Sequence, residues 1–167
     1  MLNSSNKCNK GKVIQTDSIG KDALFTSIFE WIASTYNSAN DVVQMSDKEA
    51  GIIIAKGQMS YVKYPFSMYQ TYHGHISYTL KLYLKDDRYR AVLTSLIHSN
   101  EGQTSITELG KITTDEVYSS QKSMYTKYQN LVWDDIKVVM EAYSNDLFNS
   151  LEEKTSKKEL DSDWGDW

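Results

Sequence analysis

The first hydrophobic stripe along the chain has the period of an α-helix. Its members lie between residues 22 and 36 and recur at spacings of three, four and seven: Leu24, Ile28, Trp31 and Ile32. This spacing predicts an amphipathic helix whose apolar face packs on a core. Because Trp31 lies centrally on the stripe, we expect it to be buried between this helix and a sheet.

A second stripe of the same period predicts a long helix from 125 to 154. Its members fall within one arc of the helix surface: Tyr128, Val132, Ile136, Val139, Met140, Tyr143, Leu147 and Leu151. Val138 and Phe148 fall outside this arc, so we expect them to contact something other than the main core.

Between the two helices the hydrophobic period drops to two, which predicts β-strands. Short strands are expected at 13–17 and 41–45, and a longer strand at 52–61. A hairpin begins with the strongly alternating segment 76–85. The polar segment 99–124 is expected to be a loop with at most one short strand or helical turn.

The hairpin pattern also predicts a register. If Asp86-Asp87 is a two-residue turn, the residue pairs across the hairpin follow by arithmetic. Every apolar residue on one face then meets another apolar residue. These pairs are Leu84 with Tyr89, Leu82 with Ala91, Leu80 with Leu93, and Ile76 with Ile97.

These elements together predict an α+β fold. We expect a twisted antiparallel five-stranded sheet with two helices on one face, in the order strand, helix, four strands, helix. The predicted domain covers residues 13–154. We expect 1–12 to be a flexible N-terminal tail, and 155–167 to be a flexible acidic tail that contains Trp164 and Trp167.

Charge and cysteine content exclude several classes of protein. The chain of 167 residues has 18 basic and 22 acidic side chains and a formal net charge of −4. This balance argues against a nucleic-acid binder and against adhesion to an anionic membrane. One cysteine, Cys8, permits no internal disulfide. We find no transmembrane stretch and no export signal, so a signal of an exported protein would be absent from this sequence.

The three histidines form the main candidate for chemistry. His73 and His75 flank Gly74, and the predicted register places His75 opposite His98. Cross-strand neighbours are close enough for two imidazoles to share a metal, so an enzyme with a metal at this end is the alternative hypothesis. We favour the interpretation that the three histidines face solvent, have the ordinary imidazole pKa, and bind no metal or cofactor.

Aromatic residues form the main candidate for ligand binding. They crowd the loop 61–73 and its ends: Tyr61, Tyr64, Phe66, Tyr69 and Tyr72. On the outer face of the predicted hairpin Tyr83 opposes Arg90, which favours a cation–π pair. Such a surface could bind a sugar or another flat ligand, but the same aromatic residues could instead fill one end of the core.

Several segments in combination resemble one bacterial family. They are Glu30-Trp31-Ile32-Ala33, Asp47–Gly57, Ser77-Tyr78-Thr79-Leu80 and Asp87-Arg88-Tyr89-Arg90. The chain resembles, over residues 13 to 151, a domain of unknown function with a TATA-box-binding-protein-like fold. The resemblance implies a curved sheet with two helices on its convex face, implies no activity, and fits an exported protein. The family favours Asp-Gly where this chain has Asp86-Asp87.

We therefore expect a non-catalytic binding or interaction domain of the bacterial cell envelope or periplasm. Its working surface would be the open sheet face and the aromatic loop, and its partner an unknown protein or small ligand. The alternative is a ligand- or metal-dependent enzyme centred on His73, His75 and His98.

Overall fold

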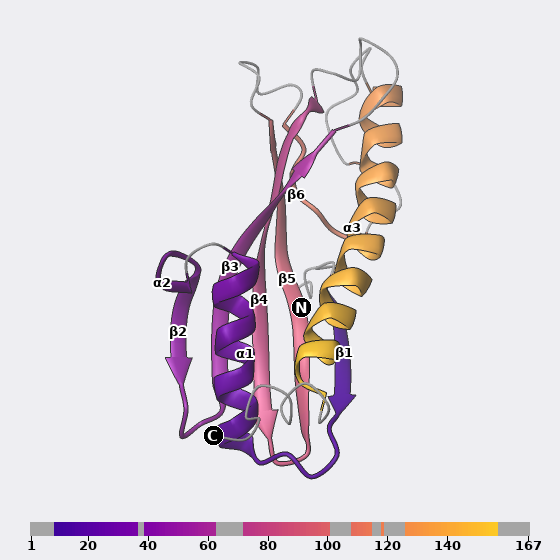
Figure 1. Ribbon diagram of the computed structural model, residues 1–167. Helices are drawn as coiled ribbons and strands as arrows, with labels where there is room; N and C mark the ends of the chain where they lie inside the picture. Colours follow the sequence, from indigo (N-terminus) through magenta and orange to yellow (C-terminus); the bar gives the residue numbers. More distant parts are fainter. Residues whose placement is uncertain are drawn as a thin grey trace, which may run out of the picture. The chain divides into compact units, whose positions relative to one another are not determined.

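The computed structural model describes residues 9–36, 39–62, 72–100, 108–114, 118 and 126–156. The helices and strands follow one another in the order shown in Figure 1. They are β1 (Lys10–Gln15), α1 (Lys21–Thr35), α2 (Ala39–Val42), β2 (Val43–Asp47), β3 (Ile52–Tyr61), β4 (Gly74–Lys85), β5 (Arg88–Asn100), β6 (Gly110–Lys111) and α3 (Thr126–Lys154).

The strands pair in one antiparallel sheet of order β1-β5-β4-β3-β2, with β6 paired to β5. The predicted α+β class with two long helices and an antiparallel sheet is confirmed. The sixth strand, β6, is the short strand that the sequence allowed within 99–124, and its two residues carry too little pattern to place it more closely. The strand expected at 41–45 is found at Val43–Asp47, since the preceding residues form the short helix α2.

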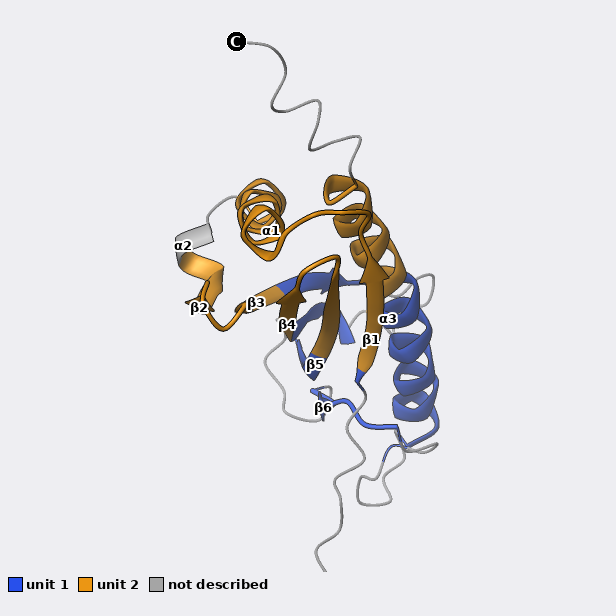
Figure 2. Ribbon diagram, turned by 90° about the horizontal axis from the view of Figure 1, so that it is seen from below, with its two compact units in different colours: residues 1–9, 58–78, 94–142 blue, residues 10–57, 79–93, 143–167 orange. Residues whose placement is uncertain are grey.

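Contacts within the chain group it into two compact units. Unit 1 comprises residues 1–9, 58–78 and 94–142, and unit 2 comprises residues 10–57, 79–93 and 143–167. Strands β3, β4 and β5 and helix α3 each contribute residues to both units (Figure 2). We describe each unit by itself.

In unit 2, α1 and the last turns of α3 pack together over the strands (Figure 2). Trp31 is 3% exposed, and its indole Nε1 donates to Ser150 Oγ of α3 at 3.1 Å. The predicted burial of Trp31 is confirmed. Phe148, which lies off the main stripe of α3, is buried as well. The reason is that this end of α3 contacts α1 as well as the strands, which widens its buried face.

The β4–β5 turn joins unit 2's hairpin to the start of α1. The Lys21 N–H donates to Asp86 Oδ1 at 2.9 Å, so Asp86 caps a helix whose N-cap residue, Gly20, has no side chain. Of the two turn residues, Asp87 takes the positive φ of 62°. The predicted two-residue turn is found between Lys85 and Arg88, but it is not type I′, which needs positive φ at both positions. The capping role of Asp86 gives a physical reason for its different conformation.

In unit 1, β5 changes which residues it buries. In the first half of the strand Tyr89, Ala91 and Leu93 are buried, but after Ser95 the buried residues are Leu96 and His98. Ser95 has a φ of 56°, and the alternation shifts there by one residue, as in a β-bulge. The predicted pairing of Ile76 with Ile97 across the core is therefore wrong: Ile97 is 41% exposed.

Candidate functional site

The uncovered face of the unit 2 strands combines positive charge with exposed apolar side chains. Alternation within each strand separates it from the face that the helices cover. We call it the basic face and define it by Val13, Lys56, Lys81, Tyr83, Lys85, Arg88 and Arg90. Val13 is 55% exposed and Tyr83 is 42% exposed, so the apolar groups on this face contact water.

Cross-strand pairing fixes several of these neighbours. Val13 of β1 pairs with Arg90 of β5, and Gln15 pairs with Arg88. Pairing brings the Cβ atoms of such residues to roughly 4.5–5.5 Å. The aliphatic Val13 therefore lies beside the guanidinium stem of Arg90, which suits a surface that is part apolar and part cationic.

Acidic side chains are scarce on this face. At the outward positions that unit 2 contributes from β1, β3, β4 and β5, the described residues include no Asp or Glu. On the edge strand β2, Asp47 pairs with Ile52, and the exposed Met45 pairs with Ile54. A chain with a net charge of −4 thus gathers five cations on one uncovered face, where they reinforce one another's potential.

The predicted ligand-binding residues do not form a single site. Tyr83 and Arg90 both lie on the basic face, as the alternation predicted. Tyr61 and Tyr72 are 1% and 2% exposed and belong to the core of unit 1, so they offer no open ligand surface. Tyr64, Phe66 and Tyr69 lie outside the described residues.

Around Tyr61, unit 1 buries a group of polar side chains. The Tyr61 hydroxyl donates to Asp135 Oδ2 of α3 at 2.7 Å. The Tyr61 ring meets the His98 ring edge to face, with centroids 5.5 Å apart. Burial, and then the hydrogen bond to the Asp135 carboxylate, raise the pKa of Tyr61 far above its usual range. Tyr61 therefore stays a neutral donor, and Asp135 is a partner that no sequence pattern indicated.

His98 is held in one tautomer. The Leu109 N–H donates to His98 Nδ1 at 3.2 Å, so that nitrogen carries no proton. The proton is then on Nε2, which donates to the Tyr72 carbonyl oxygen at 3.0 Å. Burial lowers the pKa of His98, an effect partly offset by the hydrogen bond to the Tyr72 carbonyl.

These contacts correct the expected arrangement of the histidines. His98 is 0% exposed, because the shift at Ser95 turns it to the buried face, and it does not face solvent. His75 alternates with the buried Gly74 and Ile76, so it lies on the other face of β4; His73 is half-buried. Both nitrogens of His98 already have partners. Among the described residues, no three His, Cys, Asp or Glu side chains gather closely enough to hold a metal.

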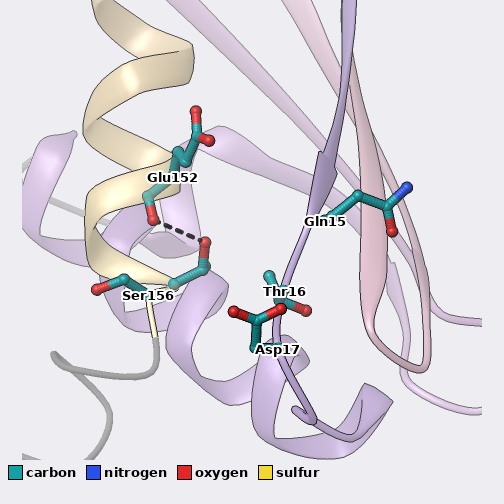
Figure 3. A pocket seen from close by; sticks show the side chains of 6 residues that line it. Gln15, Thr16, Asp17, Glu152 and Ser156 are labelled. Atoms are coloured by element: carbon teal, nitrogen blue, oxygen red, sulfur yellow. Dashed lines mark hydrogen bonds between the residues drawn. The ribbon is translucent and has the colours of Figure 1, made fainter.

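A small open pocket lies in unit 2, between the end of β1 and the last turn of α3 (Figure 3). Its volume is about 180 Å³, and its lining consists of Gln15, Thr16, Asp17, Glu152, Thr155 and Ser156. Glu152 forms an ion pair with Lys12, and the Thr155 hydroxyl is hydrogen bonded to Tyr89 and to the Leu151 carbonyl. Glu152 and Thr155 are thus already engaged within the protein, whereas the Thr16 hydroxyl is buried with no hydrogen-bond partner among the described residues.

Sequence reasoning missed two features of the molecule. Trp133 of α3 is 2% exposed; it packs against Tyr118 with ring centroids 5.3 Å apart, and Lys137 Nζ lies 5.2 Å from its centroid. The other is the part that Lys85 and Val13 play on the basic face. For these two residues the signal was present, because strand alternation places both outward.

Comparison with known proteins identifies the class of fold and then the family. The model of the domain of unknown function DUF4468, described as having a TBP-like fold, matches residues 11–98. The chain belongs to this family, and the resemblance found in the sequence is confirmed.

Two solved structures share the fold. One is a TBP-like protein from Parabacteroides distasonis, with a TM-score of 0.62 and 16% identity, covering 91% of this chain and 96% of that one. The other is a DUF4468 family protein from Bacteroides ovatus, with a TM-score of 0.66 and 12% identity, covering 90% of this chain and 86% of that one. No curated protein matches the chain.

At these identities the likeness establishes the fold and leaves the activity open. Across the described ranges, no helix is both long and apolar enough to cross a membrane.

Proposed function

We propose that this protein is a non-catalytic binding module that takes an acidic polypeptide segment on the basic face. One observation carries the proposal: five cations, together with the exposed Val13 and Tyr83, occupy outward strand positions that none of the described helices covers. Cations around exposed apolar groups suit a partner that offers carboxylates and apolar side chains together. The strand geometry suits an extended segment, because alternate residues of such a segment face the sheet.

Titration with an acidic, aromatic polymer tests this function. The probe is a random glutamate–tyrosine copolymer, and its affinity is measured by fluorescence anisotropy at several salt concentrations. Reversing two charges with Lys81→Glu/Arg90→Glu is expected to weaken binding about tenfold, which corresponds to about 1.4 kcal/mol. The affinity of the unaltered protein is expected to fall as salt rises, since exposed charges are screened.

The matched control is Lys111→Glu/Lys127→Glu, which reverses two exposed cations of unit 1. It is expected to leave copolymer binding within about twofold of the unaltered protein. Equal weakening by the control and by the basic-face variant would contradict the proposal, as would a copolymer that fails to bind. Duplex DNA is titrated in parallel. Tighter binding of DNA than of the copolymer would replace the acidic polypeptide with nucleic acid, which we predict does not bind.

We further propose that the protein acts in the bacterial cell envelope. This rests on the sequence resemblance alone. Fractionation of the source bacterium, with immunodetection of the protein, tests it: recovery in the cytoplasmic fraction would contradict an envelope role.

A further inference from the structure

The chain itself contains a segment with the chemistry that the basic face would recognise. Residues 157–167 follow α3 and lie outside the described part of the structure. They contain four carboxylates and two indoles: Glu159, Asp161, Asp163, Asp166, Trp164 and Trp167. We propose that this segment, which we call the acidic segment, binds the basic face of the same molecule and competes there with an external acidic partner. This regulation rests on the proposed function of the face.

The acidic segment begins close to the strand that carries two of the cations. Thr155 is 0% exposed, and its hydroxyl lies 2.9 Å from the hydroxyl of Tyr89. Tyr89 lies between Arg88 and Arg90 in β5, and its side chain is buried on the helix side while both arginines point outward. The start of the segment is therefore separated from the basic face by little more than the thickness of the sheet.

The segment is long enough to pass around the sheet. Eleven residues follow Ser156, and at about 3.3–3.6 Å per extended residue they span roughly 36–40 Å. Packed layers are only about 10 Å apart. The two lysines of the segment, Lys157 and Lys158, come first, so the acidic and aromatic part is the part that reaches farthest.

The chemistry of the two surfaces is complementary. Carboxylates of Asp161, Asp163 and Asp166 can accept charge-assisted hydrogen bonds from arginine and lysine. An indole is the best side chain on which a guanidinium can stack, and Tyr83 offers an aromatic neighbour. Attachment to the same chain supplies an effective concentration on the order of millimolar, so weak contacts are enough for high occupancy.

Paramagnetic relaxation in the full chain tests where the segment binds. A spin label is placed at Ser162→Cys in a Cys8→Ser background, and amide broadening is measured by NMR. We expect selective broadening at Tyr83, Arg88 and Arg90, and its loss in the variant Asp161→Asn/Asp163→Asn/Asp166→Asn. Labelling at Asn145→Cys, an exposed position on α3, is the control. Broadening that is absent from the basic face, or that appears only on an unlabelled second molecule in a mixture, would overturn the proposal.

Competition with the copolymer gives a second readout. If the segment occupies the face about nine-tenths of the time, the neutralised variant should bind the glutamate–tyrosine copolymer about tenfold more tightly than the unaltered protein. A variant with the same charge change elsewhere, Asp134→Asn/Asp146→Asn/Glu153→Gln, should not. Copolymer binding of equal affinity in all three proteins would refute the regulation and leave the proposed function standing. Selective broadening at the basic face of a protein that binds no copolymer would refute the proposed function and leave the binding of the acidic segment to that face standing.

Discussion

Unit 1 and unit 2 share three strands and a helix but differ in what they bury and what they expose. Among the described residues, the polar side chains buried in unit 1 include an imidazole and an amide, those of His98 and Gln129, each with fixed hydrogen-bonding needs. Those buried in unit 2 are the hydroxyls of Thr16, Ser27, Ser144 and Thr155. A hydroxyl can rotate to suit its neighbours, whereas an imidazole has to be matched in tautomer and protonation.

The outward-facing strand residues of the two units differ in charge. Unit 1 contributes neutral residues such as Gln58, Ser60 and Ser77, whereas unit 2 contributes the cations of the basic face. The difference teaches that unit 1 buries the groups with fixed hydrogen-bonding needs, whereas unit 2 gathers charge on its surface. Structural specificity is therefore expected to depend on unit 1 and recognition on unit 2, and three predictions test this division.

The largest expected effect is in the apolar core of unit 2. Trp31→Ala removes a buried indole and its hydrogen bond to Ser150, and should lower the free energy of unfolding by about 3–5 kcal/mol. Urea denaturation followed by circular dichroism measures the change. Trp31→Phe, which keeps an aromatic ring but loses the donor, should cost less. A loss below about 1 kcal/mol for Trp31→Ala would show that the indole contributes little to this core.

The second largest expected effect is a dependence of folding stability on pH, which arises in unit 1. His98 has a lowered pKa in the folded protein, so below the unfolded value of about 6.5 the unfolded chain binds a proton that the folded chain does not. The stability contributed by neutral His98 is complete above that pH. This stability is lost as the pH falls below about 6.5, by at most about 1.4 kcal/mol per pH unit.

Denaturation at pH 7.5 and at pH 5.5 measures this dependence, with His98→Gln as the variant that cannot titrate. The slope of stability against pH should be shallower in the variant. Ring nitrogen shifts in NMR provide an independent reading. An imidazole of His98 that is half protonated at pH 6.5 would contradict the assigned tautomer and its link to Leu109.

The smallest expected effect concerns the residue at which β5 shifts. Ser95 has a φ of 56°, where a side chain costs on the order of 1 kcal/mol and glycine does not. Ser95→Gly should therefore be neutral or stabilising by up to about 1 kcal/mol, whereas glycine at the neighbouring Thr94 should destabilise. Thermal unfolding of the two variants separates these outcomes. Equal destabilisation by both would argue against a left-handed backbone at Ser95.

Ser95 also shows why part of the site could not be predicted. Alternation in β4 and in the first half of β5 placed Tyr83, Lys85, Arg88 and Arg90 outward correctly, since a period of two needs no knowledge of neighbours. A one-residue shift inverts every later side chain. Serine is not a residue that demands positive φ, so no local signal marked the shift, and the predicted exposure of His98 was wrong.

Contacts between distant segments were equally hidden from the sequence. The stripes of α1 and α3 predicted both helices to within one residue at each end, because burial on one side imposes the helical period. The partners of those helices depend on tertiary packing. Neither the bond from Tyr61 to Asp135 nor the buried position of Phe148 has a counterpart in local spacing.

The bond from Asp86 to the start of α1 has a consequence for the order of folding. The cap joins residues 65 positions apart, so the first N–H of the helix has no side-chain cap until the hairpin has formed. A helix of 15 residues is marginal by itself in water. A peptide covering α1 should accordingly be mostly unstructured, and in the intact chain the helix should gain protection from hydrogen exchange together with the β4–β5 hairpin, as one cooperative folding unit.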